Sequence, residues 1–275
     1  MPKLRLDRLL VDRGLVPSRE RAQALILAGK VLVEEQKIEK AGAAVNEDAA
    51  IRLLAEDLRY VSRGGLKLEH ALAHWKIALA GRTCLDVGAS TGGFTDAMLQ
   101  HGAERVIAID TGYGQIAAAL RNDARVRLLE RTNARHLTAA RLRPLAGAAV
   151  TFLALDVAFI SATLVLPAVV ESVRELEYVN DVDVSIAGAS RFESVVLVKP
   201  QFEAGKGNVG KGGIVRDVTV QQAAVERVRA AVAALGGGGI EVIDSPITGT
   251  EGNKEFLLHA VFEPDSRSKS KAKSK

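Results

Sequence analysis

The sequence has a single cysteine, Cys84, among its 275 residues. One cysteine cannot form a disulfide within the chain, and it cannot build a metal site of several cysteines. Such sparse cysteine is typical of proteins in a reducing compartment, so we expect a cytoplasmic protein. The first residues, MPKLRLDRLL, also lack the apolar core of a secretory signal peptide.

A long uncharged hydrophobic run is absent as well. The nearest approach is residues 145–166, where Asp156 is the only charge. Asp156 divides this run into pieces of 11 and 10 residues, each too short to cross a bilayer. Burying the acid in lipid would cost about 2.5–3.5 kcal/mol or more. A buried strand followed by a helix explains the run better, so we expect no membrane span.

Metal-ligand patterns are scarce too. His70 and His74 have the i, i+4 spacing that places two ligands on one face of a helix, but no third ligand with suitable spacing follows them. We therefore expect no metal site.

Charge is distributed unevenly along the chain. The composition, with 48% hydrophobic and 25% charged residues, is that of an ordinary globular protein with one large core and room for a small extra domain. The net charge is +4, yet residues 1–30 alone carry +4 and residues 266–275 carry five cations and no acid. Residues 31–265 therefore sum to −5. Positive charge at the two ends suggests a polyanion as partner of the N-terminal region.

The chain is organised around residues 83–110, TCLDVGASTGGFTDAMLQHGAERVIAID. This stretch predicts a strand, a glycine-rich turn, a helix and a second strand. Its glycines allow the backbone to bend sharply and approach a ligand, and the free N–H groups of the helix point to the same place. Asp110 follows the second strand, where a carboxylate can bind the two hydroxyls of a ribose. The stretch predicts a nucleoside-cofactor site with the candidates Asp86, Gly88, Ser90, Gly92, Gly93, Phe94 and Asp110.

Three cofactors compete for this site. The spacing G-x-x-x-G-G differs from the dinucleotide pattern G-x-G-x-x-G, and no Lys-Ser/Thr follows as a P-loop requires. Asp86 beside the turn suits a cationic amino-acid group and would repel a pyrophosphate. S-adenosylmethionine fits best, although plain strand-to-helix geometry would also explain a glycine turn.

Strands and helices alternate regularly from Thr83 onward, which favours a doubly wound, mostly parallel seven-stranded α/β sheet. The expected strands are 83–87, 105–110, 126–130, 149–155, 194–199, 240–244 and 256–262, with helices near 93–100, 115–121, 162–176 and 219–235, and a loop at 236–239. Ligands of such sheets bind past the carboxyl ends of the strands. The polar residues expected there are Asp86, Asp110, Asn133, Asp156 and Lys199.

The N-terminal 60 residues form a separate basic segment with two predicted helices and a small sheet. Most of residues 3–54, with the signature LRLDRLLVDRGLVPSRERAQALILAGKVLVEEQKI, resembles the S4 RNA-binding domain. The resemblance implies a small α+β domain at 1–60 that contacts RNA through Arg5, Arg19, Arg21 and Lys30. A solvated helix face is the alternative for any one of these residues.

Nearly the whole chain resembles the TlyA (hemolysin A) family, S4-fused members of the FtsJ-like ribose 2′-O-methyltransferases. The motifs that carry the resemblance are SRGGLKL, DVGASTGGFTD, LDVAFIS, VLVKPQFE, GKGGIVRD and GNKEF. It implies a Rossmann-like methyltransferase domain at 61–264, before a basic disordered tail at 265–275, and a catalytic tetrad of Lys67, Asp156, Lys199 and Glu255. Glu251 is a rival for the last place. From pattern alone Lys67, a single lysine on a helix, would be solvent-exposed.

The resemblance further implies transfer of a methyl group from S-adenosylmethionine to a ribose 2′-hydroxyl of ribosomal RNA, usually at cytidine. Lys199 would accept or stabilise the hydroxyl proton, and Lys211 and Arg216 would lie on a basic loop over the RNA. The expected partners are ribosomal RNA or ribosomal subunits. Two other readings stay open: a membrane-active hemolysin and an RNA-binding protein without catalysis.

Overall fold

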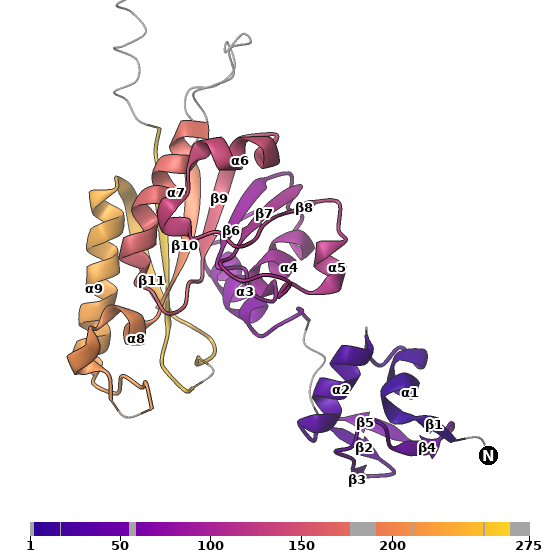
Figure 1. Ribbon diagram of the computed structural model, residues 1–275. Coiled ribbons are helices and arrows are strands. Elements are labelled where there is room, and N and C mark those ends of the chain that lie inside the picture. Colours follow the sequence, from indigo (N-terminus) through magenta and orange to yellow (C-terminus); the bar gives the residue numbers. More distant parts are fainter. Residues whose placement is uncertain are drawn as a thin grey trace, which may run out of the picture. The chain divides into compact units, whose positions relative to one another are not determined.

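The chain divides into two units, Met1–Arg59 and Tyr60–Lys275. They are seen in a computed structural model that describes residues 3–16, 18–54, 59–176, 191–210, 212–249 and 251–264 (Figure 1). The expected tail at 265–275 lies outside the described residues.

The N-terminal unit packs two helices on two small sheets. Strand β1 (Lys3–Arg5) pairs antiparallel with β4 (Ala44–Asn46), and β2 (Val31–Val33) lies between β3 (Gln36–Lys37) and β5 (Ile51–Leu53). The helices are α1 (Leu6–Asp12) and α2 (Arg19–Leu27). The hydroxyl of Ser18 caps α2 by accepting a hydrogen bond from the Arg21 N–H, as serine does at helix starts. Buried aliphatic side chains from both helices and β2 form the core.

The second unit is built on a seven-stranded sheet in the order β11-β12-β10-β9-β6-β7-β8. Six strands are parallel, and β12 runs antiparallel between β11 and β10. The strands are β6 (Thr83–Val87), β7 (Arg105–Ile109), β8 (Val126–Leu129), β9 (Val150–Leu155), β10 (Phe192–Val198), β11 (Gly237–Asp244) and β12 (Phe256–Phe262). The expected Rossmann-like fold is confirmed.

Helices cover both faces of this sheet (Figure 1). On one face α3 (Gly64–His74), α4 (Gly93–Gln100) and α5 (Ala118–Arg121) share a core, and on the other lie α6 (Ala139–Ala146), α7 (Ala162–Leu176) and α9 (Val218–Ala234). Because side chains alternate along each strand, the central strands bury residues in both cores, which is why their sequences are apolar throughout.

Two expectations about elements need correction. Residues 236–239 do not form a loop, because β11 begins at Gly237 and pairs with β12, with a register irregularity between Gly238 and Glu241. Helix α6, preceded by a short 3₁₀ turn η1 (Ala134–His136), falls in a stretch for which no helix was expected.

The strand order places the site. The chain runs outward from β6 through β7 to β8 and then returns to the other side of β6 with β9. The connections that follow β6 and β9 therefore lead away in opposite directions along the sheet. The point between these two strand ends is a switch point, where open α/β sheets bind ligands. The Asp156 N–H, just after β9, donates to the Val87 carbonyl of β6, so both strand ends stand at one level.

Candidate active site

The turn after β6 needs glycine at its first position. Gly88 has a φ of +90°, and a Cβ at this position would lie 2.2 Å from the Asp156 carbonyl oxygen. Gly93 is required for a different reason, since its Cβ would meet the Ser62 hydroxyl and the backbone of Gly65. Gly93 thus allows α4 to pack closely on α3, and it is not among the residues that line the pocket, contrary to expectation.

The Asp86 side chain is not among those that line the pocket at this sheet edge, which corrects the sequence-based expectation that it faces a ligand. Its side chain is fully buried, and Oδ2 accepts a hydrogen bond of 2.5 Å from the Thr95 hydroxyl. Burial raises the pKa of Asp86 to about 7. Its Oδ1 is buried and has no hydrogen-bond partner among the residues that the structure describes. Phe94, another cofactor candidate, and Gly92 are also buried in this part of the core, outside the pocket.

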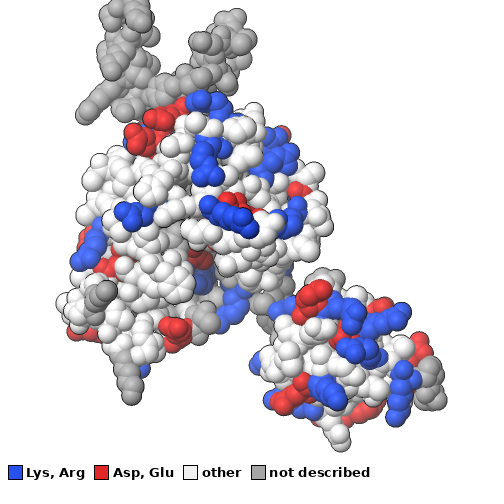
Figure 2. Space-filling model, in the orientation of Figure 1, with Lys and Arg blue, Asp and Glu red and all other residues white. Residues whose placement is uncertain are grey.

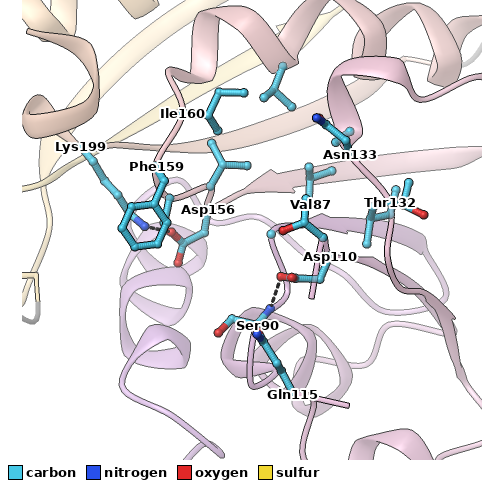
Figure 3. A pocket seen from close by; sticks show the side chains of 17 residues that line it. Val87, Ser90, Asp110, Gln115, Thr132, Asn133, Asp156, Phe159, Ile160 and Lys199 are labelled. Carbon is cyan, nitrogen blue, oxygen red and sulfur yellow. Dashed lines mark hydrogen bonds and ion pairs between the residues drawn. The ribbon is translucent and has the colours of Figure 1, made fainter. Parts of the chain in front are cut away.

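Asp110 lies as expected at the carboxyl end of β7. Its Oδ2 accepts a hydrogen bond of 2.8 Å from the Ser90 N–H of the glycine turn, and its Oδ1 accepts one of 2.6 Å from the Gly112 N–H. These two bonds fix the carboxylate while each oxygen keeps a lone pair for a further donor. Across the space from Asp110 lies Asn133, whose amide oxygen caps η1 by accepting from the Arg135 N–H (Figure 3).

A pocket of about 520 Å³ opens at the switch point. Figure 3 shows it bounded by Asp110, Ser90 and Gln115 on one side and by Asp156, Phe159 and Lys199 on the other. Its apolar wall comes from Val87, Ile109, Ile160 and Val165. Of the cofactor candidates, the pocket is lined by Gly88, Ser90, Asp110, Asn133 and Asp156.

Two of the four tetrad candidates meet inside the pocket. Asp156 follows β9 and Lys199 follows the adjacent parallel strand β10, so the two side chains emerge at the same sheet edge. The Lys199 Nζ lies 2.5 Å from the Asp156 Oδ1, an ion pair in which that oxygen accepts no well-aligned hydrogen bond (Figure 3). Both side chains are mostly buried, which strengthens the attraction between them.

The other two tetrad candidates form a second ion pair. The Lys67 Nζ of α3 lies 2.5 Å from Oε2 of Glu255, the residue before the antiparallel strand β12. Both side chains are buried, which corrects the expectation that Lys67 would be exposed. A Cβ on Gly249 would lie 2.7 Å from the Glu255 Oε1, so the loop also closes over this carboxylate. The rival Glu251 is exposed, and the geometry favours Glu255.

Phe159 is a pocket residue that sequence reasoning missed. Its side chain is 93% exposed and its backbone has a φ of +65°, which is uncommon for a bulky residue. Its ring lies 5.6 Å from that of Phe202, beside the Lys199 strand end. The signal that could have found it is an aromatic residue three positions after a strand-end acid in LDVAFIS.

Two of the N-terminal RNA candidates, Arg5 and Arg19, bind the carboxylate of Asp7, which was not itself a candidate. Asp7 is fully buried, and its carboxylate accepts hydrogen bonds from Arg5, Arg19 and Gln23. The Arg5 guanidinium above all holds the pKa of Asp7 well below its usual range. Both arginines remain about half exposed, so Asp7 orders two cations at the surface of this unit.

The remaining RNA candidates differ in exposure. Lys30 and Arg216 are exposed and Arg21 is half-buried, while Lys211 lies outside the described residues. On the face seen in Figure 2, Lys and Arg side chains of the N-terminal unit lie among Asp and Glu. On this face the cations do not form one continuous basic surface. The ordered Arg5–Arg19 pair is therefore a stronger indication of an RNA contact than the net charge of the unit.

Residues 60–262 match the model of the FtsJ-like methyltransferase family, and residues 4–51 match that of the S4 domain. The chain belongs to the FtsJ-like methyltransferase family. Both matches confirm the resemblances noted in the sequence, and the FtsJ-like match covers all seven strands of the large sheet.

The FtsJ-like chain has relatives of similar length. The 16S/23S rRNA (cytidine-2′-O)-methyltransferase TlyA of Mycobacterium tuberculosis is 44% identical over 257 residues, which cover 93% of this chain and 89% of the relative. Hemolysin A of Brachyspira hyodysenteriae is 35% identical over 259 residues, covering 94% and 100%. A solved structure described as a hemolysin from Streptococcus thermophilus shares 39% identity over 97% of this chain and 90% of that one, with a TM-score of 0.68. The expected TlyA (hemolysin A) membership is confirmed.

The hemolysin names raise the question of membrane insertion. Within the part of the chain that the structure describes, no helix is both long and apolar enough to span a bilayer. The run at 145–166 is divided among the end of α6, strand β9 and the start of α7, with loops between them.

Proposed function

We propose that this protein transfers a methyl group from S-adenosylmethionine to a ribose 2′-hydroxyl of ribosomal RNA, with cytidine as the target. The observation that carries the proposal is the Lys199–Asp156 pair, which lies in the same pocket as Asp110. A ribose-binding acid and a lysine–acid pair across one pocket suit a nucleoside cofactor and a hydroxyl acceptor. The relatives named as rRNA (cytidine-2′-O)-methyltransferases support the choice of substrate.

The pocket fits this cofactor. Asp110 would bind the ribose hydroxyls, because its two oxygens are fixed by backbone N–H groups and retain lone pairs toward the pocket. Gly88 lets the turn approach the Asp156 backbone closely, which brings the ends of β6 and β9 together beside the pocket. Asp86 would support the site indirectly, because its buried side chain accepts a hydrogen bond from Thr95 of α4 behind the turn.

The sulfonium supplies a good leaving group and a methyl carbon open to attack. The protein then has to align the acceptor oxygen and to remove its proton. Lys199, once it has released its own proton to solvent, would accept the 2′-hydroxyl proton, and the cofactor would supply the methyl group and leave as a neutral thioether. Asp156 pairs with the ammonium that results. Lys67 and Glu255 compensate each other's charge at the adjoining strand end, where they hold β12 against α3.

Phe159 provides a place for the target base. Its exposed ring stands at the pocket, beside Asp156 and Lys199. Bases of single-stranded or flipped nucleotides stack on such rings, which contributes about 1–3 kcal/mol per base.

The test is methyl transfer from labelled S-adenosylmethionine to ribosomal subunits from cells that lack this gene. We expect label in the RNA, and after nuclease digestion we expect it in 2′-O-methylcytidine. Label in a base, or none in RNA while the cofactor binds, would refute the proposal. Subunits from cells that carry the gene are the control, since their site is already methylated and should accept little label.

A further inference from the structure

Glu203 is a buried carboxylate that lies outside the pocket and outside the tetrad. It ends the short helix α8 (Pro200–Glu203), one helical turn after Lys199. Its side chain belongs to a residue only 3% exposed, and burial raises its pKa. A buried acid costs free energy unless its oxygens are well bonded, so its partners show what it holds.

Both oxygens of Glu203 bind the start of α7. Oε1 accepts a hydrogen bond of 2.7 Å from the Ala162 N–H, and Oε2 accepts one of 2.5 Å from the Ser161 hydroxyl. The Ser161 Oγ in turn accepts from the Thr163 N–H at 3.2 Å. Glu203 therefore accepts directly from one free N–H at the start of a 15-residue helix from another segment of the chain, and it holds the Ser161 hydroxyl that accepts from a second.

These bonds are one of three links between the segments that follow β9 and β10. The Asp156–Lys199 ion pair joins the segments directly at the strand ends. The rings of Phe159 and Phe202 meet farther on, at 5.6 Å. The bonds of Glu203 to Ser161 and Ala162 close the far end. The three links follow the same order along both segments, so the far link limits how the near one can move.

The segment between Asp156 and Ser161 needs such a restraint. It contains Phe159 with its positive φ, and residues 156–160 all line the pocket. A strained backbone persists only where its surroundings fix it. The backbone carbonyl of Glu203 accepts a hydrogen bond of 2.5 Å from Arg227, which anchors the end of α8 to α9.

We propose that Glu203 is a positioning residue for methyl transfer: its carboxylate locks the segment 156–161 against the segment 199–204 and so fixes Asp156 and Phe159 relative to Lys199. The inference rests on the proposed function. Glu203 touches neither cofactor nor substrate. Its effect is expected in the rate of the chemical step, because misplacement of reacting groups by about 1 Å can cost about 10²-fold.

The experiment uses the full-length protein in single-turnover methyl transfer. Enzyme bound to labelled cofactor is mixed with excess ribosomal subunits and unlabelled cofactor, so that each active enzyme molecule transfers label once. Glu203→Ala removes both bonds, Glu203→Gln retains one oxygen acceptor, and Ser161→Ala removes one bond. We expect the rate constant to fall by about 10–100-fold for Glu203→Ala and by about 3–10-fold for the two milder variants. Cofactor and RNA affinities should stay within about twofold of wild type.

Rate and amplitude separate positioning from mere stabilisation. A residue that only stabilises α7 reduces the fraction of active enzyme, which lowers the amplitude and leaves the rate constant unchanged. The matched control is Asp217→Ala, which removes another acidic helix cap, since the Asp217 carboxylate accepts from the Thr219 N–H of α9 at 2.8 Å. This control should lower the thermal midpoint and keep the wild-type rate constant.

Two outcomes decide the inference. Wild-type rate constants in Glu203→Gln and Ser161→Ala would overturn it, even if Glu203→Ala did not fold. A graded loss of rate in the order expected, with the Asp217→Ala control unaffected, would support it. Absence of transfer by the wild-type protein would instead refute the proposed function, and that result is read from the wild type alone.

Discussion

Lys199 and Asp156 follow neighbouring parallel strands, and their charged groups lie 2.5 Å apart in the pocket that also holds Asp110. A parallel pair of strands ends at one edge, so residues 43 positions apart in the chain become partners. In the proposed reaction, this arrangement would place a proton acceptor and its counter-charge beside the nucleoside cofactor.

Replacing Lys199 tests the proton acceptor. Lys199→Ala should lower single-turnover methyl transfer by about 10²–10⁴-fold, the usual contribution of a general base. Lys199→Arg should fail as well, because a guanidinium keeps its proton at accessible pH. Calorimetry should show nearly unchanged cofactor affinity, since Asp110 and the glycine turn are intact. The control is Lys254→Ala, which removes an exposed lysine paired with Asp244 and should retain activity. Wild-type transfer by Lys199→Ala would rule out its role as the base.

The Lys67–Glu255 pair should behave as a buried ion pair. Lys67→Met leaves an uncompensated carboxylate, which typically costs about 3–5 kcal/mol of unfolding free energy. The double variant Lys67→Met/Glu255→Leu should recover much of that stability, because well-packed apolar residues can replace a buried pair. Urea unfolding measures both effects. If the pair is also part of the catalytic tetrad, the double variant should be folded and inactive, whereas a purely structural pair would allow an active double variant.

Sequence patterns predicted the framework because they report local burial. The strands 83–87 and 256–262 were predicted to the residue, and the helices expected near 93–100 and 162–176 are found there, since apolar runs and glycines mark these elements. The loop predicted at the glycine-rich segment 236–239 is wrong, because pairing with β12 overrides the local preference of these glycines for a loop.

The same patterns could not place individual side chains. Lys67 is buried because of Glu255, which lies 188 positions away, and nothing near it in the chain reports that partner. Asp86 sits on β6, where all five residues are buried, so a motif that locates the cofactor turn does not show which way the acid points. Glu203 was passed over since its partners at 161 and 162 belong to another segment.

Asp86 should make the stability of the protein depend on pH. Burial raises its pKa to about 7, so the folded state keeps the proton that the unfolded state loses near pH 4. The stability contributed by the neutral form is complete below the unfolded pKa and is lost as pH rises from about 4 to about 7. Asp86→Asn imitates the neutral form and should remove this loss. Urea midpoints of both proteins between pH 5 and pH 8, without cofactor, measure the difference; parallel curves would mean that Asp86 keeps an ordinary pKa.

Asp7 makes the Arg5–Arg19 pair the sharpest test of the N-terminal unit. The buried carboxylate holds both guanidinium groups at the surface, each with N–H groups left for a phosphate. Arg5→Ala/Arg19→Ala should weaken RNA binding, and the slope of log affinity against log salt should fall by about one for each phosphate that the variant no longer neutralises. Cofactor affinity should be unchanged, because the pocket belongs to the other unit.

The control for this pair is Arg8→Ala, which removes a more exposed arginine of α1 that pairs with Asp12 and lies outside the Asp7 network. Its RNA affinity and salt slope should stay near wild type. Asp7→Asn keeps both arginines but loses the charge that orders them, so we expect weaker RNA binding with a nearly unchanged salt slope. Equal RNA affinities for the wild type, the double arginine variant and Asp7→Asn, measured by filter binding over a salt series, would show that RNA is held elsewhere on the chain.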